Sequence, residues 1–158
     1  MNLNEYQSQI VNIWENKMPP DELLLFCCVG MAEETGECMG KIKRSMRGEG
    51  FDREGYLKEL GDVLAYLVIS HHAYNLLEDL KDSSDLDDLD KKLIKPCNLL
   101  KATLMMYQET GYVLEKVESK QYSGFLHYLS DVMYEFRRCL ACPEVNSTFA
   151  EVMQQNLR

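Results

Sequence analysis

The stretch GMAEETGECMGKIKR, residues 30–44, decides both the fold class and the chemistry expected of this chain. It places Glu33, Glu34 and Glu37 within about one helical turn, directly after the apolar run LLLFCCVGMA of residues 23–32. Glu34 and Glu37 are three residues apart and therefore share a helix face. Apolar residues at helical spacing beside this acidic face predict an amphipathic helix whose acids lie next to the core.

A second acidic pair follows in LKELGDVLAYL, residues 57–67, where Glu59 and Asp62 repeat the three-residue spacing. The segment RGEGFDREG, residues 47–55, separates the two motifs, and its three glycines predict a loop. Such a loop allows an antiparallel hairpin in which the two acidic faces oppose each other. Like charges at this spacing destabilise a helix, and burying them costs more.

We expect these acids to converge with no sequence-local cation among them, so that a bound hard cation stabilises them. Oxygen-only ligands suit Mg²⁺, with Mn²⁺ as a substitute. Such a site would clamp a polyphosphate and lower the pKa of a bound water for in-line attack. The alternative is two solvated helix faces that bind nothing. The proposed ligands are Glu34, Glu37, Glu59 and Asp62.

Basic residues border the same hairpin and are candidates for contacts with substrate phosphates. They are Lys41, Lys43, Arg44 and Lys58. The alternative is that cations near a helix C-terminus only complement the helix dipole. Two glycines, Gly36 and Gly61, interrupt the helices at a cost of about 1 kcal/mol each relative to alanine. We attribute them to a close approach of the two helices.

Composition excludes several classes of partner. The net charge of −9 and the isoelectric point near 4.8 argue against binding to a nucleic-acid backbone or to an anionic membrane surface. The longest apolar run, residues 23–32, is too short to span a bilayer, and no targeting pattern is visible. A cytoplasmic protein is therefore expected. The six cysteines, which include one CxxC at Cys139 and Cys142, are expected to be reduced and buried.

Helical periodicity runs along nearly the whole chain, which predicts an all-α helical bundle in a single domain over residues 1–158. The pattern places a first helix at 3–14, before the break at Pro19 and Pro20, and Asp21 is expected to cap the next one. The remaining helices are expected at 22–46, 56–80, near 85, 98–117, 125–140 and 147–158.

A faint internal repeat divides the chain. Residues 30–45 match MMYQETGYVLEKVESK, residues 105–120, and residues 57–67 match LHYLSDVMYEF, residues 126–136, in the same order. Two pseudo-repeated helical hairpins are therefore expected. In the second copy Tyr112 and Tyr128 stand where the first has Glu37 and Glu59, while Glu109 and Asp131 stay acidic. The repeat predicts a catalytic half at 1–95 and a degenerate half at 96–158 that packs on it.

The two acidic motifs, with their order, spacing and flanking sequence, resemble the MazG-like members of the all-α nucleoside triphosphate pyrophosphohydrolases. The fused, diverged repeats resemble the dimeric dUTPase-like branch of that superfamily. The resemblance covers residues 3–80, and the remainder only through the repeat. It implies Mg²⁺-dependent cleavage of a nucleoside triphosphate between the α and β phosphates, giving a monophosphate and pyrophosphate.

The resemblance also implies roles for individual residues. The four acids named above would bind the metal, and Glu37 or Glu33 would orient or deprotonate the attacking water. The second half would lend Asn156 and Arg158, from VMQQNLR at 152–158, to the site. Candidates for stacking on the base are Trp14, Tyr66 and Tyr112.

The sequence motifs do not specify the base or the sugar of the nucleotide. A phosphoribosyl-ATP pyrophosphohydrolase shares the motif logic, and a non-catalytic helical module that holds a structural cation is an alternative of another class. The apolar segment LMMYQETGYVL, residues 104–114, predicts more apolar surface than one small bundle hides, so a homodimer is expected.

Overall fold

The computed structural model describes residues 1–14, 17–77, 85–90 and 92–158. Within these residues every regular element is helical, which confirms the all-α class and the bundle. The elements are α1 (Leu3–Trp14), α2 (Pro20–Met46), α3 (Arg53–Leu77), the short 3-10 helix η1 (Leu86–Asp90), α4 (Leu99–Glu118), α5 (Phe125–Ala141) and α6 (Phe149–Asn156). Residues 78–80 of the predicted third helix lie outside the described part of the chain.

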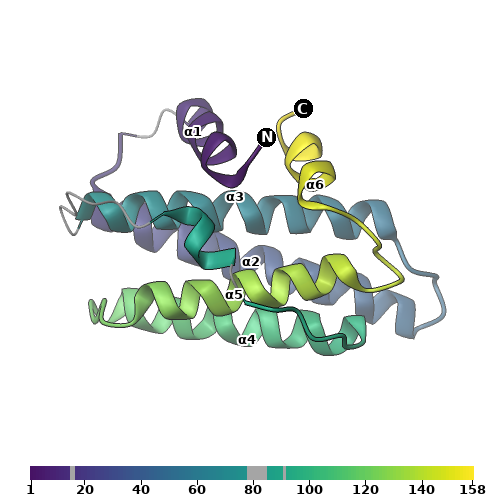
Figure 1. Cartoon of the computed structure of the whole chain (residues 1–158). Coiled ribbons are helices and arrows are strands. Elements are labelled where there is room, and N and C mark those ends of the chain that lie inside the picture. Colours follow the sequence, from purple (N-terminus) through teal and green to yellow (C-terminus); the bar gives the residue numbers. More distant parts are fainter. Residues whose placement is uncertain (15–16, 78–84, 91) are drawn as a thin grey trace.

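Two long hairpins make up the bundle (Figure 1). Helices α2 and α3 form the first hairpin and α4 and α5 form the second, with α2 packed on α4 and α3 in contact with α5. The short helices α1 and α6 lie on the outer side of α3, so the two ends of the chain meet the same helix. This arrangement brings residues far apart in the sequence to one face of the first hairpin.

Two helices begin earlier than predicted, each for a local reason. Helix α2 begins at Pro20, because a proline in the first turn loses no intrahelical hydrogen bond, and Asp21 lies within the helix rather than at its cap. Helix α3 begins at Arg53, because Asp52 precedes it and its Oδ1 accepts a 2.9 Å hydrogen bond from the backbone N–H of Gly55. Gly55 was predicted to lie in the loop, but it belongs to the first turn of α3.

The hairpins meet at the repeated ETG motifs. Thr35 Oγ1 of α2 lies 3.2 Å from Thr110 Oγ1 of α4, and both residues are buried. Each hydroxyl also donates to the carbonyl oxygen three residues earlier in its helix, at 2.9 and 2.7 Å. Equivalent positions of the two predicted repeats therefore contact each other, as expected near a pseudo-two-fold axis. The duplication itself stays a prediction.

The cysteines are reduced, as the sequence predicts. All six cysteines are free, and only Cys97 is not fully buried. Among the described helices, none combines the length and the apolar character that crossing a bilayer would need. Large apolar side chains are exposed along α2 and α4, including Met46, Leu100, Leu104 and Tyr107. The expected homodimer stays a prediction.

The explanation given for Gly36 and Gly61 was wrong. A Cβ atom on Gly36 would lie 3.7 Å from Tyr107 of α4, an ordinary contact that does not involve α3. A Cβ atom on Gly61 would lie 3.3 Å from Asn156 of α6. Gly61 therefore makes room for α6, and neither glycine governs the approach of α2 to α3.

Gly30 is the glycine that α3 requires on α2. A Cβ atom there would lie 2.5 Å from the ring of Tyr66. That ring packs edge-on against Trp14 and Phe26, with centroid distances of 5.4 and 6.3 Å. The packing of α1, α2 and α3 around this ring thus requires a residue without a side chain at position 30.

Replacing Gly30 by alanine should lower the free energy of unfolding by about 1–3 kcal/mol, because the added methyl group overpacks the contact with Tyr66. Gly40→Ala is the matched control on the same helix, since no atom lies within 4 Å of a Cβ there. It should raise the free energy of unfolding by up to about 1 kcal/mol. Urea denaturation measures both, and equal shifts for the two variants would contradict the steric explanation.

Candidate metal centre

Three carboxylates converge where α2 faces α3. Glu34 comes from α2 and Glu59 and Asp62 from α3, and one oxygen of each lies within 4.8 Å of the others. The Glu59 side chain is only 6% exposed, whereas Glu34 and Asp62 are half-buried. The structure thus brings together three of the four predicted ligands at the edge of the core.

Glu37 and Glu33 lie outside this triad, and both are exposed. The three-residue spacing alone does not exclude Glu37, since Glu59 and Asp62 have the same spacing and both belong to the triad. The charge of Glu37 still contributes to the shifted pKa of Glu34. The predicted convergence of four carboxylates is therefore reduced to three. The roles of Glu37 as a ligand and of Glu37 or Glu33 toward water stay predictions.

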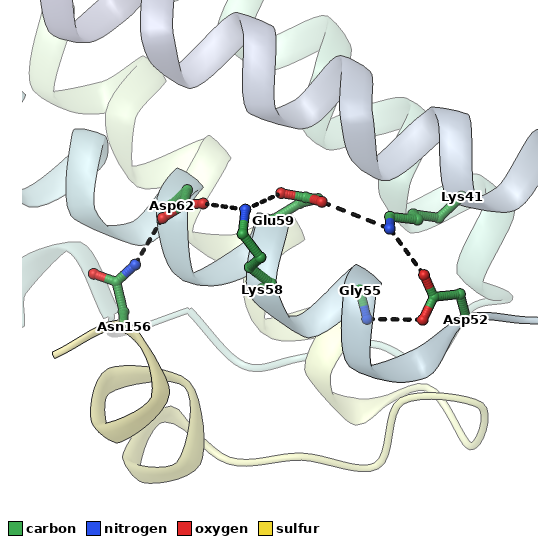
Figure 2. Close-up of polar contacts among 7 residues, drawn as sticks. All are labelled: Lys41, Asp52, Gly55, Lys58, Glu59, Asp62 and Asn156. Carbon is green, nitrogen blue, oxygen red and sulfur yellow. Dashed lines mark hydrogen bonds and ion pairs between the residues drawn. The ribbon is translucent and has the colours of Figure 1, made fainter. Parts of the chain in front are cut away.

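The expectation that no cation stands among the acids was wrong. Lys58 Nζ lies 3.0 Å from Glu59 Oε2 and 3.1 Å from Asp62 Oδ2 (Figure 2). These hydrogen bonds raise the pKa of Lys58, the one with Glu59 contributing most. The signal was present in the sequence, because Lys58 precedes Asp62 by four residues on the same helix.

A second lysine reaches Glu59 from α2. Lys41 Nζ lies 3.7 Å from Glu59 Oε1 and 2.8 Å from Asp52 Oδ2, and Figure 2 shows it between the two carboxylates. A side chain at Gly55 would overlap both the Lys41 ammonium and the Asp52 carboxylate. The glycine in the first turn of α3 therefore makes room for this ion pair.

Burial and repulsion shape the charge of Glu34. Desolvation, followed by the negative charges of Asp62, Glu37 and Glu59, raises its pKa to about 7. At neutral pH the protein without a cation therefore holds Glu34 partly protonated. The donor set consists of carboxylate oxygens only, which fits Mg²⁺ or Mn²⁺, and a divalent ion there would relieve the repulsion.

The C-terminal helix anchors the centre. Asn156 Nδ2 donates a 2.8 Å hydrogen bond to Asp62 Oδ1, and Asn156 Oδ1 accepts a 2.6 Å hydrogen bond from the hydroxyl of Tyr6. Burial, and then the charge of Asp62, raises the pKa of Tyr6, so this hydroxyl stays a donor. Asn156 of the second half therefore contacts the centre, as predicted. Helices α1 and α6 both hold Asp62 in place.

The other predicted phosphate contacts do not reach the acids. Lys43 lines a separate groove beside Met39, and Arg158 lines another beside Arg53. Arg44 is exposed, and its charge contributes to lowering the pKa of Asp52. Of the six predicted substrate-binding residues, the structure places Lys41, Lys58 and Asn156 at the centre.

A pocket of about 330 Å³ opens directly beside the carboxylates. Its volume falls within the range of roughly 300–1,000 Å³ that is typical of small-molecule sites. Trp14 and Tyr66 form an aromatic wall with ring centroids 5.4 Å apart. Tyr112 instead packs against Tyr128 in the second hairpin, 6.0 Å between centroids, so it is not part of this pocket. The pocket is lined by Glu34, Asp62, Asn156, Trp14, Tyr66 and Ile10 among others.

The second hairpin has acids at the positions that match Glu34 and Asp62, namely Glu109 and Asp131. Burial, and then the charge of Asp131, raises the pKa of Glu109, so the negative charges of these two carboxylates interact. Lys92 forms an ion pair with Asp131, and His127 Nε2 lies 3.5 Å from the same carboxylate. Protein side chains therefore supply the positive charge in this half.

Comparison of the chain with protein-family models, with curated proteins and with solved structures finds no match.

The raised pKa of Glu34 gives a pH dependence of stability. The carboxyl group has a pKa near 4.5 when unfolded and about 7 when folded. Its contribution is complete below the lower value and is lost as the pH rises through the higher one. Without divalent ions, the wild type should therefore lose stability between pH 5 and pH 8 relative to Glu34→Gln. Thermal unfolding at both pH values measures this difference. The exposed Glu115→Gln of α4 is the control, and a Glu34→Gln protein that loses as much stability as the wild type would contradict the assignment.

Proposed function

We propose that this chain is a Mg²⁺-dependent nucleoside triphosphate pyrophosphohydrolase. It would hydrolyse the bond between the α and β phosphates and release a nucleoside monophosphate and pyrophosphate. The proposal combines the resemblance of the two acidic motifs with the geometry of the centre that they form.

One observation carries the proposal: a carboxylate triad and an aromatic pocket share the same opening. Glu34 and Asp62 belong to both, and the aromatic wall of Trp14 and Tyr66 completes the pocket. A nucleotide has the matching division into a polyphosphate and a flat base. A structural cation site would need the acids but would have no use for the adjoining pocket.

The side chains around the triad have distinct tasks in this scheme. A bound Mg²⁺ would neutralise the phosphates and activate a water molecule. Asn156 fixes Oδ1 of Asp62, so Oδ2, which Lys58 contacts in the structure, would be the oxygen that faces the metal and the phosphates. Lys58 and Lys41 add positive charge beside the triphosphate. Trp14 and Tyr66 offer π faces on which a base can stack.

The rival functions make different demands on the same centre. A phosphoribosyl-ATP pyrophosphohydrolase would use the same acids and the same bond cleavage on a different nucleotide. A cation-binding interaction module would use the acids without turnover. A panel of triphosphates with phosphoribosyl-ATP included, analysed for products as well as rate, separates all three.

Replacing Asp62 by asparagine should abolish most pyrophosphate release, with a loss of at least about 100-fold, because the metal loses a charged ligand. Glu37→Gln tests the fourth predicted ligand and should be less severe if that side chain stays outside the triad. Asp131→Asn is the matched control, since Asp131 occupies the equivalent position of the second hairpin. It should retain the rate of the wild type, provided that circular dichroism shows an intact fold.

Two outcomes would contradict the proposal. One is a wild-type protein that binds Mg²⁺ but releases no pyrophosphate from any member of the panel. The other is equal loss of activity in Asp62→Asn and Asp131→Asn when both remain folded, because the acids of the first hairpin would then have no special part.

Trp14 provides a direct probe of the pocket, because it is the only tryptophan in the chain. Binding of a nucleotide with Mg²⁺ should quench or shift its fluorescence as the base stacks nearby. Trp14→Leu should raise KM by roughly 5- to 100-fold, the equivalent of one stacking contact, while kcat changes less. Inorganic triphosphate is the control ligand, since it has no base and should leave the fluorescence nearly unchanged.

A further inference from the structure

The two lysines at the metal centre differ in how firmly they are held. Lys41 is 14% exposed and is bound by Asp52, which is itself fixed by the first turn of α3. Lys58 is 65% exposed, and it contacts the two carboxylates of the triad that lie on its own helix, Glu59 and Asp62. One lysine is therefore part of the framework, whereas the other reaches into the centre on a long, solvent-exposed stem (Figure 2).

Lys58 and a divalent ion compete for the same oxygens. The ammonium contacts Glu59 Oε2 and Asp62 Oδ2, and the other oxygen of each carboxylate is engaged by Lys41 and by Asn156 respectively. A metal bound to the oxygens that Lys58 uses would lie about 2.1 Å from them, and hence within about 5 Å of the ammonium. Charges of +1 and +2 at that separation repel strongly.

We propose that Lys58 is an exchangeable internal counter-ion, which a divalent cation must displace from Glu59 and Asp62, while Lys41 stays in place. The proposal rests on the proposed function only in that a divalent cation binds the triad. It assigns to Lys58 a task that the sequence motifs do not contain, namely to set the affinity of the free protein for the metal.

A consequence concerns the order of binding. Once displaced, the Lys58 ammonium remains attached beside the centre and needs a new anionic partner. The phosphates of a substrate supply one, so metal and triphosphate should bind more tightly together than either does alone. Without substrate, Lys58 returns to the carboxylates and weakens metal binding.

The second hairpin uses the same position in a similar way. His127 stands four residues before Asp131, as Lys58 stands four residues before Asp62, and it faces that carboxylate at 3.5 Å. There Lys92 adds a further ion pair from outside the hairpin. In the first hairpin, by contrast, Lys58 can leave while Lys41 keeps its contacts with Asp52 and Glu59.

The metal alone tests the proposal in the absence of substrate. Titration with Mn²⁺, followed by the electron paramagnetic resonance of the free ion, should show that Lys58→Met binds the ion more tightly than the wild type does. Because the two ion pairs of this exposed ammonium no longer compete, the expected gain is roughly 2- to 30-fold. Lys43→Met is the matched control: it removes the same charge from the same hairpin, but its side chain lines a separate groove. It should change the affinity by less than Lys58→Met does.

Lysine ammonium NMR follows the displacement itself. With Mg²⁺, which is diamagnetic, the Lys58 ammonium signal should shift or disappear, and the Lys41 signal should persist. Assignment comes from the Lys58→Met and Lys41→Met spectra. Persistence of both signals at saturating Mg²⁺ would overturn the proposal, as would equal or weaker Mn²⁺ binding by Lys58→Met.

These outcomes are distinguishable from failure of the proposed function. If Lys58→Met gains metal affinity but no triphosphate is hydrolysed, the result supports the counter-ion role of Lys58 and contradicts the proposed enzymatic activity. If the wild type releases pyrophosphate but Lys58→Met binds Mn²⁺ as the wild type does, the result supports the enzymatic activity and contradicts the counter-ion role. If neither protein binds a divalent ion, the counter-ion proposal is overturned.

Discussion

The mutual repulsion of three carboxylates held between α2 and α3 is the constraint on which the rest of the structure depends. Packing of the hairpin forces Glu34, Glu59 and Asp62 to within 4.8 Å of one another at the edge of the core. The negative charges of Asp62 and Glu59 contribute to raising the pKa of Glu34. Positive charge must therefore come from elsewhere: from a proton on Glu34, from the lysines, or from a bound metal.

Distant parts of the chain are arranged around that constraint. The loop before α3 supplies Asp52, which holds Lys41 against Glu59, and Gly55 leaves space for the pair. The two ends of the chain meet at Asn156 and Tyr6, which fix the orientation of Asp62. The same α1 brings Trp14 to the pocket, so the elements that orient the acids also build the candidate base site.

Much of this could be predicted because it depends on local spacing. Helical periodicity gave the all-α class, and the three-residue spacing placed Glu59 and Asp62 on one face. What failed depends on which helix faces meet in the fold. Glu37 is a near neighbour of Glu34 in sequence, but it is exposed and lies outside the triad. The glycines were assigned to the wrong contacts for the same reason, since the partner of a helix face is not written in the sequence of that helix.

The sequence by itself determined the helices, the hairpin connections and the crowding of acids, because these follow from covalent neighbours and from the helical repeat. Only the tertiary structure decided which acids form the centre, which lysines neutralise it, and that Asn156 and Trp14 complete it. Those choices depend on the packing of helices that lie far apart in the chain: Asp62 and Asn156 are 94 residues apart, and Tyr6 and Asn156 are 150 residues apart. Such contacts are fixed by the shapes of all the packed faces together, and no local stretch contains them.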